Sequence, residues 1–104
     1  MKTIIDLINK NEKVYVFLSN DAIREKFMID AEEQGLSFGD GVKPTQRIAD
    51  DIMAILPDKT ICYLGWAGRM FYKHNPNSVV RIDYEKYIKN QNDYIIDFIK
   101  DSEE

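Results

Sequence analysis

Hydrophobic residues recur at two different spacings along the chain, which predicts a mixture of strands and helices. The continuous apolar run from Val14 to Leu18 contains β-favouring residues, typical of a strand buried on both faces. In residues 20–35 the apolar side chains instead follow one helical stripe: Ile23, Phe27 and Ala31. Ser19 or Asn20 is expected to cap this helix at its N-terminus, and Gly35 is expected to end it.

The remaining pattern predicts further helices and several short strands. We expect a short first helix in residues 2–11, a helix after Thr45 that stops at Pro57-Asp58, and a long C-terminal helix from Tyr84 to Phe98. In the second of these, the inward positions are Ile48, Ile52 and Ile55. Short strands are expected at residues 36–38, 60–64, 70–72 and 79–82. These elements predict an α+β fold, a two-layer sandwich in which a small, mostly antiparallel sheet is covered by about three helices.

Length and composition restrict the class of protein. Residues 1–104 have the size of one domain, and a hydrophobic fraction of 44% is enough for a packed core and argues against disorder. The apolar runs are too short to cross a membrane, no signal peptide is evident, and one cysteine cannot form an internal disulfide, so a cytoplasmic protein is expected. A net charge of −4 disfavours direct nucleic-acid binding and suits a basic partner.

The chain has few residues suited to catalysis. His74 has no evident partner to orient it as a base, and Cys62 is expected inside a strand, as part of the protein core. Acidic residues near Lys86 superficially resemble a restriction-type nuclease, but Tyr84 stands where that motif needs an acid. The paired acids Asp50-Asp51 are more simply a solvated helix face. We therefore expect no enzyme activity, no metal site and no cofactor.

Two glycine-bracketed segments are the candidate binding loops. The first, residues 38–43, contains Phe38, Asp40 and Lys43; the second, residues 65–69, contains Trp66 and Arg69. The sequence Lys43-Pro44-Thr45 partly resembles a phosphate-binding loop, although a turn in which Asp40 bonds its own backbone is the favoured interpretation. Trp66 is expected either as an exposed anchor or as a lid on the core. Arg69 is expected either to pair with Asp40 or to bind an anionic group.

The order of these segments is similar to a class of small proteins encoded by phages and mobile elements of Gram-positive bacteria. The resemblance covers residues 14–72: a strand, a helix ending in glycine, the Phe38-Gly39-Asp40-Gly41 segment, and the pair 60–63 and 70–72. That class includes inhibitors of bacterial defence, among them anti-CRISPR proteins. The resemblance carries no catalytic residues. It implies a protein that acts by binding.

Three functions follow as hypotheses from these observations. The first is a small cytoplasmic, non-enzymatic inhibitor of a larger protein or nucleoprotein complex, acting through an acidic surface. The second is a small-molecule or nucleotide-binding domain that uses the loops 39–43 and 65–69. The third is a self-assembling module that dimerises through the predicted C-terminal helix.

Overall fold

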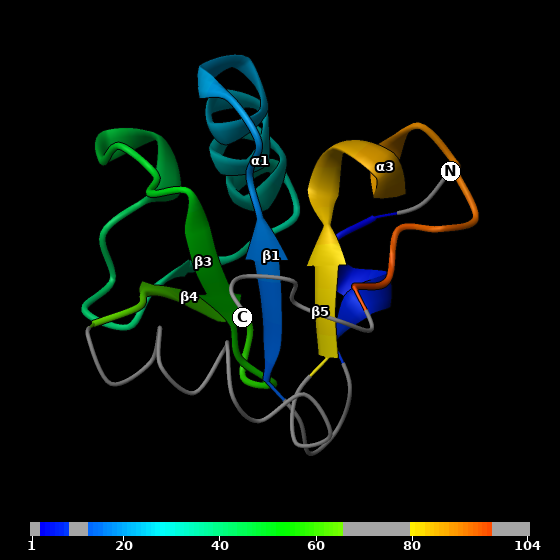
Figure 1. Ribbon diagram of the computed structural model, residues 1–104. Helices are drawn as coiled ribbons and strands as arrows, with labels where there is room; N and C mark the ends of the chain where they lie inside the picture. The colour runs from blue at the N-terminus through cyan, green and yellow to red at the C-terminus, as the bar shows by residue number, and fades with distance from the viewer. Residues whose placement is uncertain (1–2, 9–12, 66–79, 97–104) are drawn as a thin grey trace.

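The protein has an α+β fold with a mixed five-stranded sheet (Figure 1). The computed structural model describes residues 3–8, 13–65 and 80–96. The strands are β1 (Val14–Phe17), β2 (Ser37–Phe38), β3 (Ile52–Ile55), β4 (Thr60–Tyr63) and β5 (Val80–Asp83), arranged in the order β2-β4-β3-β1-β5. Within the described residues two α-helices occur, α1 (Asp21–Glu33) and α3 (Tyr84–Ile88), with 3-10 turns η1 (Ile5–Leu7) and η2 (Pro44–Gln46).

The sheet is mixed, so the expectation of a mostly antiparallel sheet is wrong. β3 pairs antiparallel with both β1 and β4, whereas β1 pairs parallel with β5 and β2 pairs parallel with β4. Only β3 and β4 follow each other through a short turn, and such turns require antiparallel neighbours. The other pairs join strands that are distant in sequence, and for these the direction depends on the path of the intervening chain.

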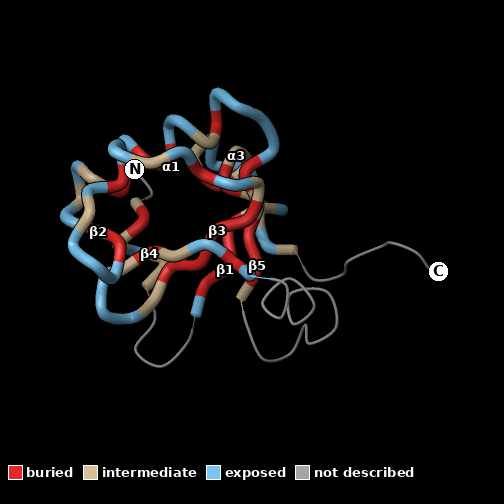
Figure 2. Tube along the Cα trace, turned by 90° about the vertical axis from the view of Figure 1, so that its left-hand side faces the viewer, coloured by how far each residue is buried: buried red, intermediate tan, exposed pale blue. Residues whose placement is uncertain are grey.

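The main core lies between α1 and one face of the sheet. The α1 side chains that enter it are Ile23, Phe27, Met28 and Ala31. They pack with the inward residues of the strands, which include Val16, Met53, Ile55, Ile61 and Ile82. The helical stripe predicted for residues 20–35 is thus confirmed. Figure 2 shows buried residues on the strands and exposed residues on the outer turns.

Both ends of α1 follow local rules that the sequence displays. The Asn20 side chain accepts a hydrogen bond from the backbone N–H of Ile23 at 3.0 Å, as an N-cap residue does. Gly35 follows the last turn with a φ of 86°, a conformation that residues with a Cβ adopt rarely. Both predictions for this helix are confirmed, and the helix is positioned by signals within its own segment.

A second, smaller cluster lies on the opposite face of the sheet. Its buried members are Tyr15, Ile52, Ala54 and Leu64, with Phe17 and Cys62 packed against them. Arg81, which is opposite Tyr15 in the β1–β5 pairing, is also buried. β1 therefore carries buried residues on both faces, as its continuous apolar run predicts. Cys62 lies within β4 as expected, half-buried, and burial raises the pKa of its thiol.

The prediction of a helix after Thr45 is wrong. This stretch forms only the single turn η2, and residues 52–55 are instead strand β3, which is paired on both sides. A buried apolar run satisfies helical and strand spacing equally well, and pairing with β1 and β4 decides the outcome. Ile48, which the helix would have placed inward, is 87% exposed.

The prediction of a long C-terminal helix is also wrong. α3 ends at Ile88, and Asn90 has a positive φ of 59°. Residues 94–96 then run beside β5: the N–H of Asp83 donates to the carbonyl of Tyr94, and the N–H of Ile96 donates to the carbonyl of Arg81, both at 2.8 Å. β5 has an open edge whose backbone groups need partners, and these residues supply them. The described residues hold no long helical seam for a dimer.

The remaining elements agree more closely with the prediction. Strands were expected at 36–38, 60–64 and 79–82, where β2, β4 and β5 occur, whereas the strand expected at 70–72 lies outside the described residues. Of the short helix predicted for residues 2–11, the described part contains only the turn η1. Among the described residues, no helix has the length and apolar character needed to cross a membrane.

Candidate functional site

The predicted binding residues are placed very differently by the fold. Phe38 is buried in β2, Asp40 lies in an exposed turn, and Lys43 is exposed immediately before η2. Trp66 and Arg69 lie outside the described residues, as does His74. Of the two glycine segments, the first lies within the described residues up to its last position, together with the elements around it.

Residues 38–42 form the tight turn that was the favoured interpretation. The N–H of Val42 donates to Asp40 Oδ1 at 3.3 Å, and the N–H of Gly41 donates to the Phe38 carbonyl at 2.9 Å. Gly41 has a φ of 88°, so the turn requires a residue that tolerates the left-handed region. The other oxygen of Asp40 is 2.7 Å from Arg47 Nη2. Arg47, which the sequence analysis did not consider, is thus an ion-pair partner of Asp40.

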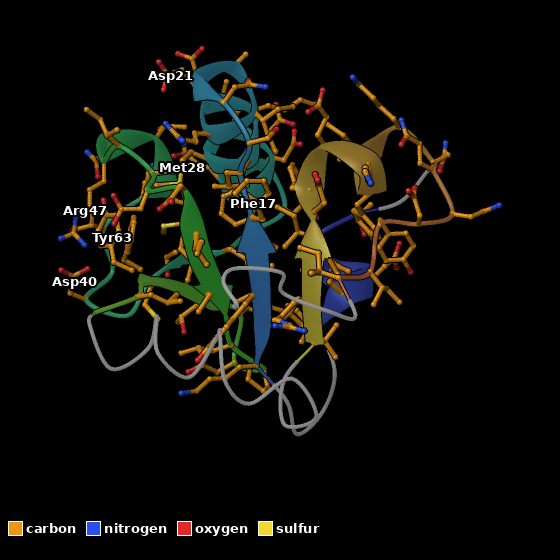
Figure 3. All side chains as sticks on the ribbon, in the orientation of Figure 1. Phe17, Asp21, Met28, Asp40, Arg47 and Tyr63 are labelled. Carbon is orange, nitrogen blue, oxygen red and sulfur yellow. The ribbon has the colours of Figure 1, made fainter. Side chains whose placement is uncertain are left out.

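Arg47 joins this turn to the sheet. Its guanidinium lies over the ring of Phe38, 4.5 Å from the centroid, and that ring stacks on Tyr63 with a centroid separation of 5.4 Å. The hydroxyl of Tyr63 donates to the carbonyl of Ile48 at 2.7 Å. We call Asp40, Arg47, Phe38 and Tyr63 the Arg47 cluster. It holds residues 47 and 48 in place without regular secondary structure, and Figure 3 shows the labelled Arg47, Tyr63 and Asp40 grouped together.

At the segment that partly resembles a phosphate-binding loop, the hydrogen-bond donors of Thr45 are already bound to an acidic side chain of the protein itself. The backbone N–H of Thr45 donates to Glu32 Oε1 at 3.1 Å, and the Thr45 hydroxyl donates to the same oxygen. These bonds hold the pKa of Glu32 below its usual range. The N–H of Lys43 donates to the Gln46 side chain. A phosphate at this position would face the Glu32 carboxylate, which disfavours a nucleotide site here.

A groove of about 560 Å³ lies between α1 and residues 45–49. We call it the α1 groove. One wall consists of α1 residues and the other of the irregular segment: Asp21, Ala22, Arg24, Glu25, Met28 and Ile29 face Thr45, Arg47, Ile48 and Ala49. Figure 3 places Met28 between α1 and the Arg47 cluster, with Asp21 at the far end of the helix. Helix α1 and the Arg47 cluster therefore set the shape of this groove.

The groove has a buried apolar floor and exposed apolar side chains on both walls. Met28 and Ala49 are buried, whereas Ile29 on α1 is 44% exposed and Ile48 on the opposite segment is 87% exposed. Single exposed apolar residues are common on protein surfaces, whereas Ile29 and Ile48 lie on opposite walls of the same groove. Sequence reasoning missed this feature because the spacing of isoleucines predicted a helix with Ile48 facing inward.

Not every charged side chain of the α1 groove has an ion-pair partner within the described residues. Arg24 donates to Asp21 at 2.8 Å and to the Leu18 carbonyl at 3.3 Å, and Arg47 is held by Asp40. The Glu25 side chain makes no hydrogen bond or ion pair within the described part of the chain. Both arginines are therefore engaged, and the unmatched charge in the groove is negative.

The acidic residues considered as nuclease ligands are used structurally. Asp83 caps α3 by accepting from the N–H of Lys86, and Glu85 accepts from Ser19 and Lys89. The bonds from Lys89 and Ser19 lower the pKa of Glu85. In residues 3–8, 13–65 and 80–96, no group of three His, Cys, Asp or Glu side chains is placed to hold a metal ion.

Comparisons of the chain with protein-family models, curated proteins and solved structures gave no match.

Proposed function

We propose that this is a non-enzymatic binding protein that contacts a larger protein or nucleoprotein complex through the α1 groove and the acidic surface around it. The observation that carries the proposal is the pair Ile29 and Ile48, exposed on opposite walls of one groove. When a partner covers an exposed apolar side chain, the free energy of the complex is lowered by about 25 cal/mol per Å² of buried apolar area.

Charge supports the same kind of partner. The chain has a net charge of −4, and α1 itself carries five acidic and two basic residues. An acidic surface favours association with a basic surface and suppresses binding to nucleic-acid phosphate. Proteins that hold nucleic acid present such basic grooves, so an acidic protein of this size is suited to compete for one.

The specific version of the proposal is an inhibitor encoded by a phage or mobile element, acting on a defence complex in the manner of anti-CRISPR proteins. It is supported by the order of segments over residues 14–72 and by the acidic surface. A direct test expresses the protein in bacterial strains that each carry one CRISPR-type defence system, followed by phage plating. We expect restored plating in at least one strain. Unchanged plating in every strain would remove the inhibitor version.

The contact site is tested separately with three tagged proteins. The wild type, an Ile29→Ser/Ile48→Ser double variant and an Ile95→Ser control are used to capture partners from a bacterial lysate at increasing salt concentration. Ile95 is 49% exposed and does not line the groove, so it matches the change in polarity. A partner retained by the wild type and the control but lost by the double variant supports the proposal. Identical capture by all three proteins would contradict it. A steep loss with salt would indicate mimicry of nucleic acid.

A further inference from the structure

We infer that the α1 groove binds a linear segment of a partner protein in which an aliphatic side chain stands next to an arginine or lysine. The inference rests on the proposed function and specifies the partner at the same site. It follows from two separate properties of the groove, its apolar floor with exposed isoleucines and its single unmatched charge.

The apolar part of the groove is suited to side chains of an extended or helical segment. Met28 and Ala49 form a buried floor, and Ile29 and Ile48 stand on the walls beside it. The volume of about 560 Å³ lies within the range of roughly 300–1,000 Å³ that is usual for sites that enclose a ligand. A pocket of this shape holds a few inserted side chains, as grooves that bind peptide segments do. An aliphatic residue is the simplest group that covers both isoleucines.

The charge of the groove specifies the residue beside this anchor. Arg24 and Arg47 already bind Asp21 and Asp40, whereas Glu25 has no partner in the described residues. A guanidinium or ammonium placed next to the aliphatic anchor would pair with Glu25. An acidic or phosphorylated segment would instead bring a second negative charge toward Glu25 with both arginines engaged elsewhere, and like charges are strongly disfavoured at such contacts.

The test uses a displayed library of random linear peptides, selected on the purified wild-type protein. We expect enrichment of peptides with Leu, Ile, Val or Met adjacent to Arg or Lys. Selections on Ile48→Ser and Glu25→Gln are run in parallel, with Ile95→Ser and Glu33→Gln as matched controls, because Glu33 is an exposed acid of the same helix that does not line the groove. The dichroism spectrum of each variant confirms its folding, which surface positions of this kind tolerate well.

Affinities of synthetic copies of the enriched peptides give the decisive result. Ile48→Ser and Glu25→Gln should each weaken binding by about tenfold, while the two controls leave it unchanged. A Glu25→Lys variant should in turn prefer copies in which the basic residue is replaced by Glu, which a purely structural role of Glu25 would not produce. Enrichment of acidic or uncharged peptides, or equal affinities for Glu25→Gln and Glu33→Gln, would overturn the inference.

The two proposals can fail independently. If lysate capture depends on Ile29 and Ile48 but no aliphatic-basic peptide is enriched, the segment inference is wrong and the binding function stands. If such peptides bind as expected but lysate capture is the same for the double variant, the linear-segment chemistry is supported and the proposed role of the groove in partner capture is wrong.

Discussion

The two walls of the α1 groove are built in opposite ways. α1 is a regular helix, capped by Asn20 and ended at Gly35, whose buried stripe fixes it on the sheet. The segment 43–49 has one 3-10 turn and is held chiefly by side chains: Glu32 at Thr45, Tyr63 at Ile48 and Asp40 at Arg47. The helical wall depends on a continuous buried stripe and local backbone bonds, whereas the irregular wall is anchored in the core only at Pro44 and Ala49 and otherwise depends on a few exposed polar contacts.

This difference means that the two walls should respond to different perturbations. Core packing contributes most of the stability of a small domain, and exposed polar contacts contribute little to the whole. The irregular wall can therefore loosen while the fold persists, and the groove would change shape without unfolding.

Loss of core packing under α1 should destabilise the whole protein. Phe27 is fully buried, and its ring meets Tyr84 edge-on at 5.2 Å. We expect Phe27→Ala to lower the free energy of unfolding by about 3–5 kcal/mol, since it removes apolar contact and leaves a cavity. Urea denaturation measures this change, with Ile29→Ala on the exposed side of the same helix as the control. Equal losses for the two variants would show that α1 is not held by its buried stripe.

Removal of the N-cap of α1 should lower the free energy of unfolding by a smaller amount. Asn20→Ala leaves the N–H of Ile23 without its acceptor, and we expect a loss of about 1 kcal/mol. Asn20→Asp should retain most of the stability, because a carboxylate also caps and suits the helix dipole. Thermal unfolding of the three proteins provides the comparison. No difference between Asn20→Ala and the wild type would mean that the cap does not support this wall.

Removal of the Tyr63 hydroxyl should act mainly on the irregular wall. Tyr63→Phe keeps the ring stacked on Phe38 but deletes the hydrogen bond to the Ile48 carbonyl. We expect about 0.5–1 kcal/mol of lost stability, as for a partly exposed hydrogen bond. Amide exchange should accelerate in residues 47–49 and remain unchanged in the centre of α1. Faster exchange in both walls alike would contradict their independence.

Acid should loosen the irregular wall before the helix. Bonds from Thr45 lower the pKa of Glu32, and the bond from Arg47 lowers the pKa of Asp40. A lowered folded-state pKa stabilises the structure at neutral pH, and this contribution is lost as the pH falls below about 4.5 toward the folded values. NMR signals of Thr45 and Ile48 should shift over this range ahead of those of Phe27. Glu32→Gln should reduce the shift at Thr45, and an unaltered titration in that variant would refute the assignment.

Substitution of the exposed anchor should leave stability almost unchanged. Ile48 has most of its surface in water, so Ile48→Ser removes few contacts within the protein. We expect a change within about 0.5 kcal/mol, measured by urea denaturation. A marked loss would show that Ile48 packs within the protein, and its role as a binding anchor would then be untenable.

Local signals in the amino-acid sequence account for several parts of the fold. The strand at residues 14–18, the helix after Asn20 and its end at Gly35 follow from apolar spacing, capping chemistry and backbone freedom within a few residues. The turn at Asp40 follows from the same kind of rule. Each of these features is stabilised by neighbours in the chain, so the pattern and the structure agree.

The remaining features depend on contacts between segments that are distant in the sequence. Residues 52–55 became a strand through pairing with β1 and β4, and residues 94–96 left the helical pattern to cover the edge of β5. The α1 groove depends on Arg47, Tyr63 and Glu32, which meet their partners only after the chain has folded. Local spacing cannot encode a contact between residues that far apart, and for this reason Ile48 was expected inside and lies at the surface.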